Sequence, residues 1–143
     1  CWGTCKKTEG FKRHRDMSAI AEYLRDLEKF LDSIPFRLST NVNVENRGGI
    51  ALYLRGEIEF VNGSQLHFRE YFIAIPVLRK LAYSYHYQDK DKEIIFRFDN
   101  AEHHQELETY PHHKHTENAV TPSKEMSLKE ATTEALNILL KSI

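Results

Sequence analysis

Cysteine is nearly absent from this sequence of 143 residues, and its two copies, Cys1 and Cys5, both lie in the first five positions. The rest of the chain therefore has neither a disulfide framework nor a thiolate metal site. Long apolar runs are also missing, because none approaches the roughly 20 residues that a membrane-spanning helix needs. No basic start followed by an apolar stretch resembles a signal peptide. These absences predict a soluble cytoplasmic protein that does not enter a membrane.

An excess of charge of either sign is missing as well. The chain has 20 Lys and Arg against 21 Asp and Glu, a formal net charge of −1. Contact with nucleic acid would therefore have to come from a local patch rather than from a global positive field. The length fits one domain with its own core. We expect a single domain at residues 17–143, and we interpret residues 1–16 as a disordered extension or an expression remnant.

The hydrophobic pattern predicts two helices and five strands. Apolar residues recur at spacings of three and four from Ser18 to Ile34, which indicates a helix that Pro35 ends. The period then changes to two, and the predicted strands are 36–45, 50–61, 66–75, 78–88 and 92–99. The tail carries "SLKE", a capping box that begins a second helix at Ser127. The predicted fold is α+β, an antiparallel five-strand meander with both helices on one face.

Glu70 interrupts the apolar face of the third predicted strand, where Leu66, Phe68 and Phe72 are its neighbours. A buried carboxylate needs a partner. The candidates on adjacent strands are Arg97, Tyr83, Tyr85 and Tyr87. Two interpretations stay open, a structural ion pair that fixes strand register and a carboxylate that is catalytic or orients a catalytic group.

Residues 99–115 hold five of the eight histidines, namely His103, His104, His112, His113 and His115. Three interpretations compete. The stretch could bind a transition metal. It could supply an acid-base pair for RNA cleavage, with Arg97 and Lys114 on the phosphate, because the pKa of histidine lies near operating pH. It could also be a solvated loop, and composition alone does not choose among the three.

Four motifs carry a family resemblance: "LHFREYF", "YSYHYQD", "IFRFDNAEHH" and "YPHHKH". In this order and spacing they resemble the TumE-type toxins of prokaryotic toxin–antitoxin pairs, from about Leu52 to the C-terminal helix. The resemblance implies a toxin that acts on RNA or translation and is neutralised by a helix-turn-helix antitoxin. Its motifs fall on Glu70, Tyr85, Tyr87, Arg97, Asp99, Asn100, His103, His104, Pro111, His112, His113 and His115. Glu102 and Gln105 stand where the family commonly has proline.

Our first hypothesis is a ribonuclease toxin that works without a metal or other cofactor. Its catalytic candidates are Glu70, Arg97, Asp99, His103, His104, His112, His113, Lys114 and His115. Its binding candidates are Tyr85, Tyr87 and Asn100. The alternative is a non-catalytic module that binds a partner, or zinc or another transition metal through His103, His112, His113 and His115.

Three further expectations concern partners and folding. An antitoxin should cover the edge of the sheet or the N-terminal helix, and self-association into a homo-oligomer stays open. Because the side chains of a loop bury little surface, replacing His113 or His115 by alanine should leave folding nearly unchanged.

Overall fold

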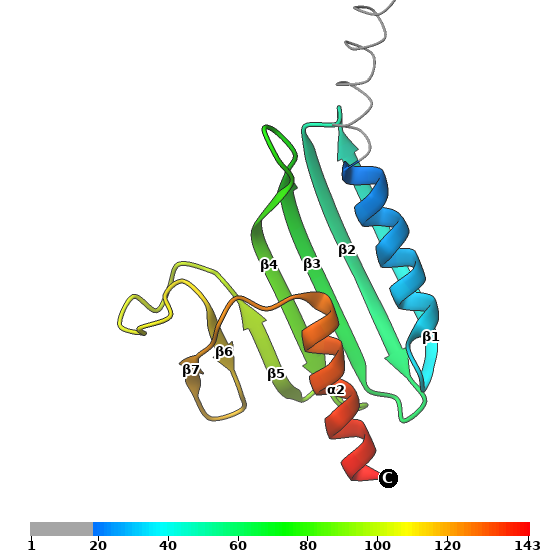
Figure 1. Cartoon of the computed structure of the whole chain (residues 1–143). Coiled ribbons are helices and arrows are strands. Elements are labelled where there is room, and N and C mark those ends of the chain that lie inside the picture. The colour runs from blue at the N-terminus through cyan, green and yellow to red at the C-terminus, as the bar shows by residue number, and fades with distance from the viewer. Residues whose placement is uncertain (1–18) are drawn as a thin grey trace, which may run out of the picture.

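The computed structural model of the chain describes residues 19–143. The expected disordered extension at residues 1–16 lies outside the described residues. Within them the predicted α+β class and the antiparallel meander are confirmed (Figure 1). The described residues form a sheet of seven strands rather than five, paired in chain order. The strands are β1 (Arg37–Arg47), β2 (Ala51–Phe60), β3 (Gln65–Ile73), β4 (Arg79–Gln88), β5 (Ile94–Asp99), β6 (His113–His115) and β7 (Val120–Pro122).

The two unexpected strands come from the histidine-rich stretch and the residues after it. Residues 113–115 pair with β5, and residues 120–122 pair in turn with residues 113–115. Each strand has three residues, which is too short to show an alternating pattern. The stretch expected to be wholly irregular is therefore partly a sheet extension, and only residues 100–112 connect β5 to β6 without helix or strand.

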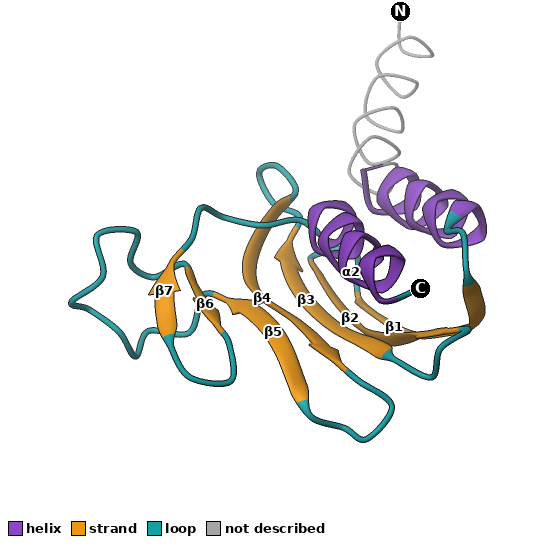
Figure 2. Cartoon of the chain, turned by 90° about the horizontal axis from the view of Figure 1, so that it is seen from below, coloured by secondary structure: helices purple, strands orange, loops and turns teal. Residues whose placement is uncertain are grey.

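Both helices lie on the same side of the sheet, as predicted, and none of residues 19–143 forms a helix on the opposite face (Figure 2). The N-terminal helix is described over residues 19–33, and α2 spans Leu128–Ser142. The N-terminal helix and the residue after it contribute Ile20, Leu27, Leu31 and Ile34 to the core, and α2 contributes Leu128, Ala131, Ala135 and Leu139. These side chains cover Leu52, Leu54, Ile58, Phe60, Leu66, Phe68, Tyr85, Phe96 and Phe98, which alternate along β2 to β5. One face of the sheet is therefore a core, and the other is left open.

The predicted capping box begins α2. The Ser127 side chain accepts a hydrogen bond from the Glu130 backbone N–H at 3.1 Å, and the Glu130 carboxylate accepts one from the Ser127 N–H at 3.1 Å. Both backbone donors would otherwise lack a partner at the helix start. Among the described residues, no helix is long and apolar enough to cross a membrane.

The long edge strand β1 is only partly covered. Its residues Leu38 and Val44 are 64% and 48% exposed. A hollow of about 410 Å³ lies between this strand and the N-terminal helix, and its lining includes Leu24, Leu31 and Val42. Apolar surface therefore remains accessible along this edge.

Candidate functional site

The strand register lines up polar residues in two rows across the open face of the sheet. Side chains alternate between the two faces along β3. Phe68 and Glu70 point toward the helices, so His67 and Arg69 point to the open face. One row runs Arg55, Arg69, Ser84, Asp99 and His113, from β2 to β6. The neighbouring row runs Glu57, His67, His86, Arg97 and His115. Residues far apart in the sequence thus form one continuous polar surface.

A hollow of about 460 Å³ lies on this surface, and its lining includes Arg55, His67, Arg69, Ser84, His86 and Arg97. Arg55 and Arg69 are directly opposite each other on β2 and β3. Like charges in such a cross-strand pair destabilise a sheet. Neither guanidinium forms an ion pair with any of residues 19–143. The pair of arginines therefore destabilises the free protein. It is suited to bind an anion that bridges the two guanidinium groups.

Two histidines flank these arginines. The rings of His67 and His86 are 6.3 Å apart between centroids. The His86 Nε2 lies 3.2 Å from the Gln88 amide oxygen, and the His67 Nδ1 lies 3.5 Å from the Glu57 carboxylate. Partial burial, with a smaller contribution from the Arg97 charge, lowers the pKa of His86 below its usual 6.5. His86 is therefore mainly neutral at pH 7.

Three of the predicted histidines form a second cluster, at the β5–β6 end of the same face. The rings of His104, His113 and His115 contact one another with centroid distances of 4.7 to 5.6 Å. Asp99 lies beside them, its Oδ1 2.8 Å from the His113 Nε2 and its Oδ2 3.5 Å from the His115 Nε2. The Asp99 Oδ2 also accepts a hydrogen bond from the Arg97 Nε at 3.0 Å. Arg97 and Asp99 thus lie beside these imidazoles at the β5–β6 end of the open face.

His113 differs from its expected state. It was expected to be an exposed loop residue, but it lies in β6 and its side chain is 1% exposed. Its Nδ1 donates a hydrogen bond to the Pro111 carbonyl oxygen at 2.8 Å. The premise of an exposed loop side chain is therefore wrong for this residue. Because replacing His113 by alanine would leave a cavity and an unpaired carbonyl, we expect that variant to be destabilised.

The remaining members of the histidine-rich stretch lie elsewhere. His103 is exposed, with its ring centroid 6.5 Å from that of His104. His112 stacks on Tyr83, and its Nδ1 lies 2.9 Å from the Tyr83 hydroxyl. Lys114 points to the helix-covered side, where its Nζ donates to Glu134 at 2.6 Å. Lys114 was expected to join Arg97 on a phosphate, but the two side chains leave opposite faces of the sheet.

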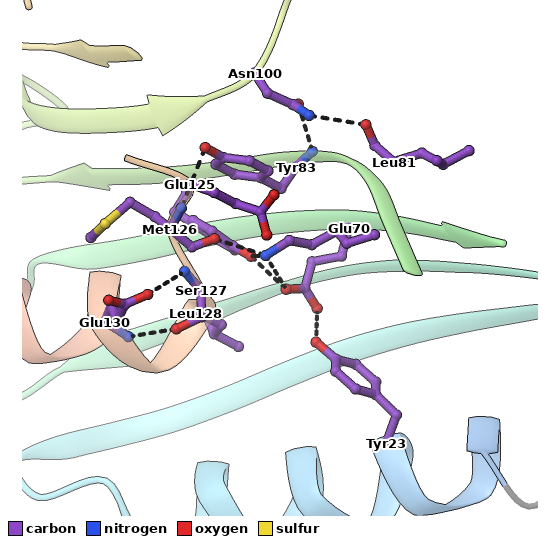
Figure 3. A network of polar contacts seen from close by, with 12 residues as sticks. Tyr23, Glu70, Leu81, Tyr83, Asn100, Glu125, Met126, Ser127, Leu128 and Glu130 are labelled. Carbon is purple, nitrogen blue, oxygen red and sulfur yellow. Dashed lines mark hydrogen bonds and ion pairs between the residues drawn. The ribbon is translucent and has the colours of Figure 1, made fainter. Parts of the chain in front are cut away.

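Glu70 is buried under the helices and lies at the centre of a network that Figure 3 shows. It accepts hydrogen bonds from the hydroxyls of Tyr23 and, at 2.5 Å, Tyr85, and its Oε2 lies 3.9 Å from the Lys80 Nζ. Burial, and then the Glu70 charge, raises the pKa of both tyrosines far above 10. The tyrosine partner was anticipated, whereas Arg97, the other candidate, lies on the opposite face. Glu70 contacts no imidazole among the described residues.

The three predicted binding residues make internal contacts. Tyr85 and Tyr87 are 0% and 1% exposed, and the Tyr87 hydroxyl donates to Ser64 at 2.8 Å. The Asn100 side chain bonds to the backbone of Tyr83 and Leu81, at 3.0 and 2.9 Å. Tyr85 and Tyr87 therefore lie in the core, whereas Asn100 ties the end of β5 to β4 and lines a surface hollow of about 530 Å³ beside Arg97 and Asp99.

The comparison with protein families decides the family. Residues 12–142 match the model of the family described as Toxin TumE. The chain belongs to the TumE toxin family. As a member it is a toxin and goes with an antitoxin partner. The match begins inside the segment that we had set apart as an extension. No curated protein and no solved structure matches the chain.

The motif residues of this TumE toxin divide between the two faces of the sheet. Glu70 and Tyr85 lie under the helices, whereas Arg97, Asp99 and His115 lie on or beside the open face. His67, His86, Arg55 and Arg69 were not among the predicted site residues. One feature of the sequence could have identified them. Each alternates with the apolar residues of a predicted strand and therefore faces away from the core.

Proposed function

We propose that this TumE toxin cleaves RNA with two imidazoles and no metal, and that the open face of the sheet binds the sugar-phosphate backbone. The observation that carries the proposal is the hollow in which His67 and His86 stand among three guanidiniums, those of Arg55, Arg69 and Arg97. Guanidinium groups bind phosphate bidentately. A local patch of this kind is the nucleic-acid contact that a chain of near-zero net charge requires.

The chemistry is a transfer of the phosphoryl group to the neighbouring ribose oxygen. The neutral His86 takes the proton of the 2′-hydroxyl, whose oxygen then attacks the adjacent phosphorus. The P–O5′ bond breaks, and His67 in its imidazolium form gives a proton to the departing oxygen. The products are a 2′,3′-cyclic phosphate and a 5′-hydroxyl. The arginines stabilise the negative charge that develops on the phosphorane oxygens.

Spacing favours this pair over the cluster of His104, His113 and His115. A base and an acid that act on opposite sides of phosphorus each need a position within about 3 Å of their own oxygen, with the phosphoryl group between them. The ring centroids of the cluster are 4.7 to 5.6 Å apart, against 6.3 Å for His67 and His86, and one ring nitrogen of each cluster member lies within 4.8 Å of the others. His113 is also buried. That leaves no room for a phosphate between them. The wider pair on β3 and β4 lines a hollow that can accept one.

Cleavage of a labelled RNA by the purified chain in EDTA tests the proposal. His86→Ala should reduce the cleavage rate by about 10²- to 10⁴-fold, the usual contribution of a general base. His103→Ala is the matched control, because it removes an exposed imidazole outside the hollow and should leave the rate unchanged. RNA with a 2′-deoxy sugar at the cleaved position should resist. Full cleavage by His86→Ala, or cleavage of the deoxy substrate, would exclude this mechanism.

We also propose that the antitoxin carries a helix-turn-helix domain and that another part of it covers the β1 edge and the N-terminal helix. The exposed Leu38 and Val44 and the hollow beside Leu24 supply an apolar contact surface there. The affinity of the complex should then depend weakly on salt. Replacing Val44 by aspartate should weaken antitoxin binding without changing RNA cleavage by the free toxin. A steep loss of affinity with salt would contradict apolar docking.

A further inference from the structure

We propose that His104, His113 and His115 form a binding site for a divalent transition metal of the zinc class, separate from the cleavage site. Each offers a ring nitrogen, and the three nitrogens lie within 4.8 Å of one another. Tetrahedral zinc with nitrogen ligands at about 2.0 to 2.1 Å holds those nitrogens roughly 3.3 Å apart. The cluster therefore needs to contract by no more than about 1.5 Å to surround an ion.

The buried nitrogen of His113 provides an independent observation. Its Nδ1 carries the proton that is donated to the Pro111 carbonyl, so in the neutral ring the Nε2 presents a lone pair. In this neutral form the Nε2 is buried and has no hydrogen-bond donor as a partner in the part of the chain that the structure describes. It lies 2.8 Å from the Asp99 Oδ1, which is also electron-rich. A cation between the His113 Nε2 and the Asp99 Oδ1 would remove their repulsion, because both atoms would then be its ligands.

The surroundings of the cluster match those of metal ligands. Histidines that bind metals usually donate their second ring N–H to a carbonyl or a carboxylate, which fixes the ring. The His113 Nδ1 has the Pro111 carbonyl in this role, and the His104 Nδ1 lies 3.2 Å from the Glu106 carboxylate. In both rings the Nε2 is thereby left for an ion. Buried Asp99 is the candidate for a fourth ligand through its Oδ1.

The donor set indicates which metals fit. Imidazole nitrogens suit Zn²⁺, Cu²⁺, Ni²⁺ and iron, whereas Mg²⁺ and Ca²⁺ prefer oxygen. This set differs from the four ligands that the sequence predicted, because His103 and His112 are turned away and His104 takes their place.

The position of the site indicates what a bound ion would do. Two ligands, His113 and His115, stand two residues apart on one face of β6, and His104 comes from the connection between β5 and β6. An ion would tie that connection to the sheet. Through Asp99 it would also fix Arg97, whose Nε donates to the other carboxylate oxygen. The ion has no step in the proposed cleavage.

Calorimetric titration of the untagged, EDTA-dialysed full chain with Zn²⁺ tests the site, with thermal unfolding as a second readout. Cys1 and Cys5 are replaced by serine in all samples to remove other zinc-binding thiolates. We expect one Zn²⁺ per chain and a melting temperature that rises by several degrees at saturating zinc. Co²⁺ should give the visible absorption of a tetrahedral site.

The variants make the assignment specific. His104→Ala and His115→Ala should each weaken Zn²⁺ binding by about 10-fold or more. Even residues that only orient a metal ligand usually contribute that much to the metal affinity. His103→Ala, next in sequence to His104, should bind Zn²⁺ as the parent does. No binding at micromolar zinc, or equal binding by His104→Ala and the parent, would overturn the proposal.

Cleavage assays on the same preparations keep the two proposals distinct. A chain that binds one Zn²⁺ but cleaves no RNA, with or without the metal, would refute the proposed function and leave the metal site supported. A chain that cleaves RNA in EDTA and binds no Zn²⁺ would refute the metal site and leave the proposed function supported.

Discussion

The buried carboxylate on the covered face of the sheet and the arginine pair on the open face differ in how their charges are compensated. On the covered face, the buried Glu70 has two tyrosine donors and a nearby lysine, Lys80. On the open face, Arg55 stands opposite Arg69 with no carboxylate partner among residues 19–143. The first arrangement satisfies every charge that it buries, and the second leaves repulsion unrelieved. We infer that the covered face determines stability and that the open face is kept for a ligand.

The sharpest test of this contrast is the double variant Arg55→Gln, Arg69→Gln. Each arginine should contribute hydrogen bonds between charged groups worth about 1.5 to 3 kcal/mol to the bound phosphate. We expect RNA cleavage to fall by about 10²-fold or more, while the free energy of unfolding stays unchanged or rises because a like-charge pair is removed. Denaturant unfolding beside a cleavage assay measures both. A variant that loses stability and keeps activity would reverse our assignment of the open face.

A substitution on the covered face should lower stability and leave RNA cleavage unchanged. Glu70→Gln leaves Lys80 partly buried without its counter-charge and removes a charged acceptor from Tyr23 and Tyr85. We expect a loss of about 3 kcal/mol in the free energy of unfolding. Cleavage per folded molecule, measured well below the midpoint of unfolding, should be unchanged. A selective loss of cleavage would favour the catalytic interpretation of this carboxylate instead.

Gly56 is in contact with both faces of the sheet. Its backbone lines the hollow of the open face, and the Phe68 ring of the core occupies the position where a Cβ atom would lie. A Cβ at this position would come within 2.5 Å of both the Asn41 carbonyl oxygen and the Phe68 ring. Gly56→Ala should therefore cost about 1 to 3 kcal/mol in stability through overpacking. Thermal unfolding measures the loss. Gly48→Ala at the exposed β1–β2 turn is a useful comparison, because its Cβ meets no atom within 4 Å and only its positive φ of 63° is unfavourable.

The smallest expected effect is a dependence of stability on pH through His86. Its pKa in the folded chain is lowered, mainly by burial, so between that value and about 6.5 the unfolded chain binds more protons. Stability should therefore rise as the pH increases through this window and stop rising, for this group, above about pH 7. Melting temperatures recorded in EDTA should show a shallower rise for His86→Gln than for the parent. An equal slope in both proteins would mean that His86 titrates normally.

The helices, the first five strands and the turn of Glu70 toward the core could all be predicted because each depends on local patterns. The capping box at Ser127 and Glu130 needs only four adjacent residues. Alternation assigned Glu70 to the apolar side of β3 without knowledge of any other strand. The fourth and fifth strands were likewise long enough to show a period of two.

The candidate site could not be predicted in the same way because it depends on register. Alternation shows that Arg55 and Arg69 face away from the core, but only the pairing of β2 with β3 places one opposite the other. His67 and His86 are single histidines in their strands and become a pair only across β3 and β4. Clustering along the sequence drew attention to His103 and His112 instead. The three-residue length of β6 likewise concealed that His113 is buried.

The order of the strands has a consequence for how the chain folds. Each strand pairs with its neighbours in sequence, so every pairing except that of β5 with β6, which closes over residues 100–112, closes a short loop at a small entropic cost. We expect such a sheet to form rapidly, strand after strand, as the polypeptide leaves the ribosome. The contacts of Tyr23 with Glu70 and of Lys80 with Met126, just before α2, span 47 and 46 residues, so the covering helices dock across larger separations than neighbouring strands do. Before α2 is synthesised, the nascent chain would expose the apolar face of β3 to β5 to any factor that binds unfolded proteins.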